Sequence, residues 1–241
     1  MEVQLTNYGS RRDLGLSALF KDRREAGKNL AERLVEYKSF NPLILALPRG
    51  GVPVGYEIAK RLNAPLEVLP VRKLAAPGMR EYAIGAIAPG GVKILDEEAI
   101  ERLGISEDKL IEIEQEEEEE LERRIKEYPG AKFIPDVGGK TVILVDDGVA
   151  TGATARAAIQ AVLAQNPDKL IVALPVCSAQ AQESLVWAIR GGRDEIICLA
   201  TPANFTSIGM WYENFDQVTD EDVVRILKES RKLYSKKPLH L

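Results

Sequence analysis

Residues 141–154 read TVILVDDGVATGAT, and this stretch decides which fold the chain adopts. Its first five residues are apolar or β-branched, as is typical of a strand buried in a parallel sheet. Asp146 and Asp147 follow this strand, and a loop of small residues comes next. The helical pattern of residues 155–164 then begins. A strand, a loop and a helix in this order predict one half of a βαβ unit.

Short apolar runs alternate with periodic segments along much of the chain. We expect strands at 42–47, 66–71, 141–145, 170–174 and 195–199. We expect helices before and between them at 21–38, 52–62, 155–164 and 179–189. This alternation predicts an α/β fold, a Rossmann-like and mostly parallel sheet with helices on both of its faces. Sheets of this kind bind ligands at the carboxyl ends of their strands.

Two segments fall outside this alternation. Residues 97–103 and 106–128 read as helices, so we expect residues 93–137 to form a helical insertion packed beside or over the core. Residues 201–241 start irregularly and end in a helix that Thr219 is placed to cap. We interpret this last segment as part of a covering structure, a hood, over the core.

The chain has 241 residues and a formal charge of −5, which suits one α/β domain spanning residues 1–241. A mildly acidic chain is a poor general binder of nucleic acid. No apolar stretch reaches the roughly 20 residues of a membrane helix, and the first residues lack a secretory pattern, so we expect a cytoplasmic protein without a membrane partner. Cys177 and Cys198 lack metal-ligand spacing, and the single histidine, His240, lies next to the C-terminal residue. A multi-histidine metal site is therefore excluded.

The loop after the 141–145 strand has the composition of an anion site. Backbone N–H groups at the start of a helix bind phosphate, and small side chains let the ligand approach. We expect this site to be lined by Gly148, Val149, Ala150, Thr151, Gly152, Ala153 and Thr154. Asp146 and Asp147 would accept hydrogen bonds from sugar hydroxyls, which together with the loop suggests a ribose 5-phosphate. The alternative is a plain strand–turn–helix with an aspartate cap. The loop fits neither the Walker A nor the dinucleotide pattern.

Residues 142–154, in this setting, resemble the phosphoribosyl-diphosphate signature of type I phosphoribosyltransferases. The resemblance to a subgroup of predicted phosphoribosyltransferases of unassigned substrate covers most of the chain from Phe20 onward. The shared motifs are Phe20-x-Asp22-Arg23, Leu47-Pro48-Arg49-Gly50-Gly51, Val71-Arg72-Lys73 and Val218-Thr219-Asp220-Glu221.

The resemblance implies a diphosphate loop at residues 47–51. Arg49 would contact the leaving diphosphate, and Gly50 and Gly51 would let the backbone approach it. Such loops in the family often contain a cis peptide bond, which would fall here between Pro48 and Arg49. On the residues alone, a tight turn with a surface arginine is the alternative.

The resemblance also implies a basic pair ahead of a mobile catalytic loop. Lys73 would stabilise developing charge on the diphosphate, and Arg72 would do the same or pair structurally. Residues 75–82 would be the mobile loop that excludes water on closure. Met79 and Arg80 depart from the pair that the subgroup usually has there.

The implied reaction displaces diphosphate from 5-phosphoribosyl-1-diphosphate by a nitrogenous, nucleobase-like acceptor. Mg²⁺ would assist, held by Asp146 and Asp147 through water or through ribose hydroxyls. The acceptor would lie under the hood, where an aromatic cluster either packs in the core or stacks on the base. The cluster consists of Phe205, Trp211, Tyr212 and Phe215. Family analogy suggests a homodimer. The alternative function is a regulatory module that binds the same ligand without turnover.

Overall fold

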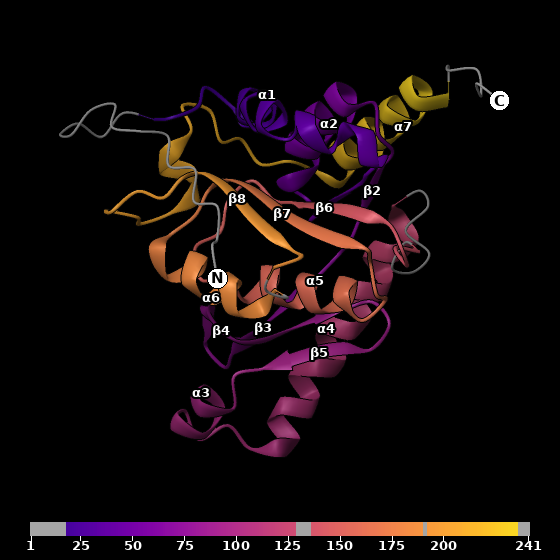
Figure 1. Ribbon diagram of the computed structural model, residues 1–241. Coiled ribbons are helices and arrows are strands. Elements are labelled where there is room, and N and C mark those ends of the chain that lie inside the picture. Colours follow the sequence, from indigo (N-terminus) through magenta and orange to yellow (C-terminus); the bar gives the residue numbers. More distant parts are fainter. Residues whose placement is uncertain (1–17, 129–135, 190–191, 236–241) are drawn as a thin grey trace.

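The computed structural model describes residues 18–128, 136–189 and 192–235, and a five-stranded sheet lies at its centre (Figure 1). The strand order is β2-β1-β6-β7-β8, and all four neighbouring pairs are parallel. The strands are β1 (Leu43–Ala46), β2 (Leu66–Val68), β6 (Thr141–Val145), β7 (Lys169–Val176) and β8 (Glu195–Ala200).

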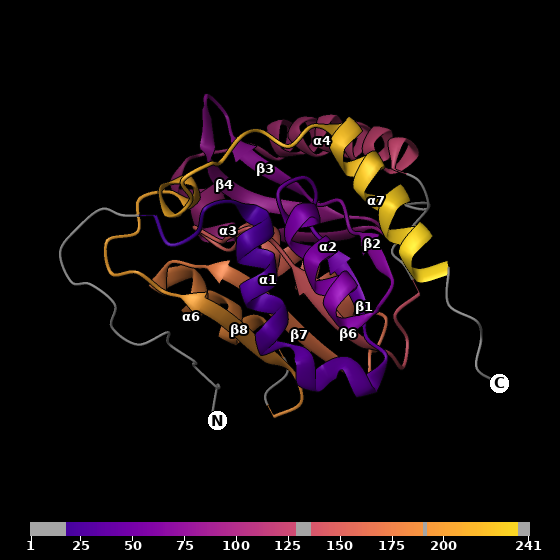
Figure 2. The same cartoon turned by 90° about the horizontal axis from the view of Figure 1, so that it is seen from above.

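Helices cover both faces of this sheet, as Figures 1 and 2 show. One face carries α1 (Arg23–Arg33), α2 (Gly51–Leu62) and α7 (Asp220–Ser235), and the other carries α5 (Ala153–Leu163) and α6 (Ala179–Ala188). Side chains of a strand alternate between the two faces, so Ile143 packs into one core cluster and Leu144 into the other. Both are buried, which explains the unbroken apolar run. The predicted fold class is confirmed.

The chain order creates a switch point in the sheet. From β1 the chain moves to β2 on one side, whereas β6 pairs with β1 on the other side and leads on to β7 and β8. The loops that follow β1 and β6 therefore begin at neighbouring strand ends and lead away in opposite directions along the sheet. Ligands of open α/β sheets bind at such a crevice.

The protein contains a second, antiparallel sheet that the sequence patterns did not predict. It comprises β3 (Arg72–Ala76), β4 (Met79–Ala88) and β5 (Val92–Leu95), and α3 (Glu97–Arg102) and α4 (Glu107–Glu127) follow it. The segment expected as a mobile loop, residues 75–82, forms the hairpin that joins β3 to β4. Its two-residue turn, Pro77-Gly78, uses the positive φ of 73° at Gly78. The insertion expected at 93–137 was also wrong as a purely helical unit, because β5 lies at its start.

The small sheet packs on α5, so α5 lies between the two sheets (Figure 1). The sheet's other face meets α3 and α4 through buried side chains such as Leu74, Ile84 and Leu121. The insertion is thus a sheet-and-helix unit that stands beside the core.

Several predicted boundaries shift in the structure. The helix expected at 21–38 divides into α1 and a 3-10 helix, η1 (Val35–Phe40), and the strand expected at 66–71 ends at Val68. Within the described ranges no helix is long and apolar enough to cross a membrane. His240 and the end of the expected insertion lie outside the described residues.

Candidate functional site

The loops after β1 and β6 lie side by side at the switch point. The Leu47 amide donates to the Val145 carbonyl over 2.8 Å, which extends the β1–β6 pairing to the start of both loops. The peptide bond between Pro48 and Arg49 is cis, as expected from the resemblance. A Cβ atom at Gly51 would lie 2.6 Å from the Val145 carbonyl oxygen, so only glycine allows this close approach.

The loop after β6 is anchored to the end of β7. The Val149 amide donates to the Val176 carbonyl, the Ser178 amide donates to the Val149 carbonyl, and the Ser178 hydroxyl donates to Ala150 O over 2.6 Å. These bonds use the carbonyl groups of Val149 and Ala150. None of these bonds involves the N–H groups of residues 150–155.

The amides of residues 150–155 have no acceptor among the residues that the structure describes. They include the first N–H groups of α5, which a helix cannot satisfy internally. Gly152, with a φ of 87°, turns the chain into this helix, and Thr151 is exposed. A cluster of free amides at a helix N-terminus matches the predicted phosphate site in its chemistry.

Asp146 precedes this loop at the end of β6 and is partly exposed. Its Oδ1 accepts a hydrogen bond from the Asp147 amide over 2.8 Å. Burial raises the pKa of Asp146 well above its ordinary value, and the neighbouring Asp147 carboxylate raises that pKa further. The Asp147 amide and the Arg23 charge stabilise the charged form of Asp146 only in part, and hydroxyl donors or a cation would stabilise it further.

Asp147 has a different environment, which no pattern in the sequence predicts. Its Oδ2 accepts from Arg23 Nε over 2.7 Å, and the two side chains are only 11% and 12% exposed. The Tyr212 hydroxyl donates to the Asp147 carbonyl over 2.5 Å. Burial raises the pKa of Asp147, and Arg23 opposes this shift. The two adjacent acids, expected to act together on ribose, thus have unlike partners.

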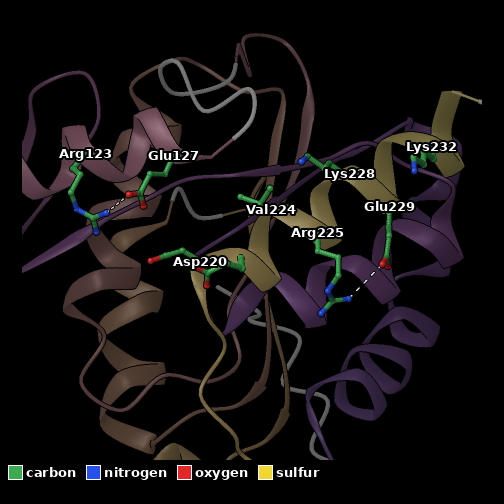
Figure 3. A pocket seen from close by; sticks show the side chains of 9 residues that line it. Arg123, Glu127, Asp220, Val224, Arg225, Lys228, Glu229 and Lys232 are labelled. Atoms are coloured by element: carbon green, nitrogen blue, oxygen red, sulfur yellow. Dashed lines mark hydrogen bonds and ion pairs between the residues drawn. The ribbon is translucent and has the colours of Figure 1, made fainter.

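Arg49 lies close to Asp220, one of the residues that line a groove between α4 and α7. Its Nη1 is 3.7 Å from Asp220 Oδ2, and Asp220 Oδ1 also accepts the Tyr128 hydroxyl over 2.5 Å. Figure 3 shows Asp220 at the edge of this groove, with Arg123 of α4 across from Lys228 of α7. The groove encloses about 790 Å³. At 3.7 Å the Arg49–Asp220 contact orients the guanidinium without a direct hydrogen bond.

Arg72 and Lys73 lie on opposite faces of β3. Arg72 forms an ion pair with Glu117 of α4 at 2.6 Å, so its guanidinium links β3 to this helix of the insertion. Alternation along the strand directs Lys73 to the other face, the one shared with its cross-strand partner Ala86. Ala86 belongs to the same core cluster as the residues of α5. Lys73 therefore lies on the side of β3 that faces α5, the helix that begins at the predicted phosphate site.

The aromatic residues of the expected hood pack on one another. The rings of Tyr212 and Phe215 stack at 5.0 Å, those of Phe205 and Trp211 lie 6.3 Å apart, and Tyr212 meets Phe20 at 5.5 Å. Tyr212 is buried. Core packing is therefore the role that the structure gives Tyr212.

The carboxylate oxygens of Asp146 suit a hard cation that binds together with a phosphate ligand. The described residues contain no group of three or more side chains able to cage a metal ion. Among the residues that the structure describes, only the Asp147 amide is seen to donate to the Asp146 carboxyl group, and burial raises the pKa of this group well above its ordinary value. Mg²⁺ usually retains waters and combines one or two carboxylates with substrate phosphates, so Asp146 fits such an ion.

Comparisons with known proteins agree on one family. Residues 20–187 match the family described as "Phosphoribosyl transferase domain". Two Mycobacterium tuberculosis proteins, of strains CDC 1551 and H37Rv, are each 40% identical over 214 residues and bear the name "Putative phosphoribosyl transferase". The match covers 89% of this chain but 47% of theirs, so the chain spans about half the length of these relatives. The crystal structure of TT1426 from Thermus thermophilus is 40% identical, with a TM-score of 0.70 over 87% of this chain and 98% of that one.

Proposed function

This chain belongs to the phosphoribosyltransferase family, and we propose that it transfers the 5-phosphoribosyl group of 5-phosphoribosyl-1-diphosphate to a nitrogenous, nucleobase-like acceptor. Diphosphate leaves as the acceptor nitrogen attacks the anomeric carbon. The proposal covers the activity of this chain, which corresponds to about half of its Mycobacterium tuberculosis relatives.

The unsatisfied amides at the start of α5 carry the proposal. Residues 150–155 present N–H groups without acceptors in the described part of the chain, close after the partly exposed Asp146. A ribose 5-phosphate would use both features, because its phosphate accepts from the amides while its hydroxyls donate to Asp146. A plain glycine turn would require neither feature.

The neighbouring loop supports a diphosphate beside that sugar. Gly50 and Gly51 let the backbone come close, and Arg49 offers a guanidinium that is one-third exposed. Lys73 lies on the α5 side of β3 and would stabilise the charge that develops on the departing diphosphate. These residues position and stabilise charge, so no covalent intermediate on the protein is needed. Mg²⁺, when bound with the diphosphate, would neutralise part of the leaving group's charge, with Asp146 as the protein residue that fits it.

A turnover screen tests the proposal. The protein is incubated with phosphoribosyl diphosphate, Mg²⁺ and a panel of purine and pyrimidine bases, and diphosphate release is measured. We expect base-dependent release with at least one acceptor. Tight, Mg²⁺-dependent binding without release for any base would favour the regulatory module, and no binding at all would refute both readings.

A further inference from the structure

The two cysteines of the chain, Cys177 and Cys198, lie against each other near the edge of the central sheet. Cys198 is part of β8, and Cys177 directly follows β7, the strand that pairs with β8 (Figure 1). Both side chains pack on the core cluster that lies on the side of α5 and α6. Their Sγ atoms are 2.8 Å apart, and both thiols are free. A disulfide bond needs about 2.05 Å between these atoms, so a small movement would allow the bond to form.

The two thiols differ in their access to solvent. Cys177 is completely buried, whereas Cys198 is partly exposed. The Cys198 thiol donates to the Cys177 sulfur, and this hydrogen bond lowers the pKa of the Cys177 thiol and raises the pKa of the Cys198 thiol. One proton is therefore shared between the two sulfurs when the other is lost, and the thiolate is the reactive form of a cysteine. The exposed part of Cys198 brings this pair within reach of a small solute.

Cys177 also lies within the contact that anchors the loop after β6. Its two neighbours both bond to Val149: the Val149 amide donates to the Val176 carbonyl, and the Ser178 amide donates to the Val149 carbonyl, each over 3.0 Å. The Ser178 hydroxyl holds the Ala150 carbonyl of the same loop. A shift of the Cys177 backbone would therefore strain the bonds that hold the loop at the predicted phosphate site.

We propose that Cys177 and Cys198 form a reversible disulfide bond with a peroxide as the oxidant, and that this bond loosens the loop after β6 and weakens binding of phosphoribosyl diphosphate. The effect on the ligand rests on the proposed function, whereas the disulfide bond and its effect on the loop do not. The chain contains two cysteines, so no third thiol competes for the pairing within one molecule.

The reaction consumes one peroxide for each pair of thiols. With the shared proton on Cys177, the Cys198 thiolate attacks an oxygen of hydrogen peroxide, so an S–O bond forms and the O–O bond breaks. The hydroxide that leaves takes the proton from Cys177 and becomes water. The Cys177 thiolate then attacks the Cys198 sulfur, the S–S bond forms, and the hydroxyl group of the sulfenic acid leaves as hydroxide. The two sulfurs lose two electrons, which the peroxide accepts, and a dithiol reductant reverses the oxidation.

The first arm of the test asks whether the bond forms within one folded chain. The reduced protein is treated with hydrogen peroxide, and its free thiols and proteolytic peptides are then measured. We expect both thiols to disappear and the peptides that contain Cys177 and Cys198 to be linked, with a mass about 2 Da below their sum. Dithiothreitol should reverse both changes. Thiols that remain, or disulfide bonds between chains on a non-reducing gel, would overturn the proposal.

The second arm follows the loop without any ligand. Amide hydrogen exchange is measured at Val149 and Ser178 in the reduced and the oxidised protein. We expect exchange at both amides to be at least about tenfold faster after oxidation, since strained hydrogen bonds open more often. Cys198→Ser keeps a donor but cannot form the bond, so this matched control should exchange equally with and without peroxide. Equal exchange in the reduced and oxidised wild type would refute the coupling to the loop.

The third arm measures binding of phosphoribosyl diphosphate with Mg²⁺ by calorimetry. We expect oxidation to weaken binding by the wild type about tenfold or more, because charge-assisted hydrogen bonds to the loop are strained, and dithiothreitol to restore it. The exposed Met79 and Met210 are open to peroxide in Cys198→Ser as well, so an equal loss in that control would trace the effect to methionine and overturn the proposal. If the reduced wild type fails to bind, the proposed function falls, while the first two arms still decide the disulfide bond and its effect on the loop.

Discussion

Gly50 of the proposed diphosphate loop rests directly on Asp147 of the proposed sugar site, so that a Cβ atom at residue 50 would lie 2.0 Å from the carboxylate oxygen Oδ2. Gly51 stands in a similar relation to Asp146, whose Oδ1 would be 3.3 Å from a Cβ atom there. The two loops of the site are therefore mutually fitted, glycine against aspartate. Each pair brings together residues that are far apart in the sequence.

The first prediction concerns Gly50→Ala. Gly50 has φ −62° and ψ −33°, which alanine adopts readily, so only the contact with Asp147 opposes the change. Forcing a methyl group into this space should destabilise the protein by about 1–3 kcal/mol and weaken binding of phosphoribosyl diphosphate. Thermal unfolding and calorimetry measure the two effects.

Gly138→Ala is the matched control for this variant. A Cβ atom there would meet its nearest neighbour at 3.4 Å, an ordinary contact, and its φ is not positive. We expect an unchanged Tm in this control. If Gly50→Ala behaved like the control, the close packing of the two loops would be wrong.

The second prediction separates stability from function at Asp146. Because burial and Asp147 raise the pKa of Asp146, the charged form of Asp146 opposes folding. Asp146→Asn keeps an acceptor for the Asp147 amide and removes the charge. The ligand-free variant should be more stable by about 1–3 kcal/mol although it binds the ligand less well. A lower Tm in this variant would show that the Asp146 charge is already compensated in the free protein.

The third prediction is that the stability gained in Asp146→Asn depends on pH. A carboxyl group whose pKa is raised on folding contributes most to stability below its unfolded value, near 3.8, and this contribution is lost as the pH rises through the raised value. The stability difference between Asp146→Asn and wild type should therefore be largest at neutral pH and shrink as the pH falls toward about 4. Urea unfolding at a series of pH values measures it.

The difference between the two proteins, and not the wild-type curve, is the informative quantity. Arginines lower the pKa values of carboxylates such as Glu120 and Asp222. The stabilisation that these carboxylates give the protein is lost as the pH falls, which masks the opposite trend of Asp146. These groups are common to both proteins and cancel in the subtraction. A difference that stayed constant from about pH 7.5 to about pH 4 would contradict the assigned pKa shift.

The central sheet and its two loops were predictable because their signals are local. A buried strand such as 141–145 is an unbroken apolar run, and the loop chemistry lies next to it in sequence. The Arg23–Asp147 pair was not predictable from either residue, since they are 124 positions apart. The motif around Arg23 marked the residue without revealing its partner.

The small sheet, β3-β4-β5, could not be predicted from the sequence for a different reason. Residues 72–95 contain many alanines and glycines, which carry little strand propensity, and their apolar alternation is short. Packing on α5 and α4 stabilises these strands, and such tertiary support leaves no pattern in the strands themselves. The turn residues Pro77 and Gly78 were the available signal for the hairpin.

The last prediction contrasts the two cations of β3. Lys73→Ala should lower turnover about 100-fold, as expected when one group that stabilises developing charge is removed, with binding of phosphoribosyl diphosphate within about threefold. Arg72→Gln breaks the pair with Glu117, so it should loosen the packing of α4 on β3 and cost about 1 kcal/mol, with turnover reduced only a few-fold. Both variants are compared by kcat, KM and Tm with an acceptor from the turnover screen. Neighbouring residues of a strand face opposite sides, so the two variants should show opposite effects. Lys73→Ala should lower kcat and leave Tm unchanged. Arg72→Gln should lower Tm and largely keep kcat. The opposite assignment would place Arg72 at the diphosphate and Lys73 in the insertion.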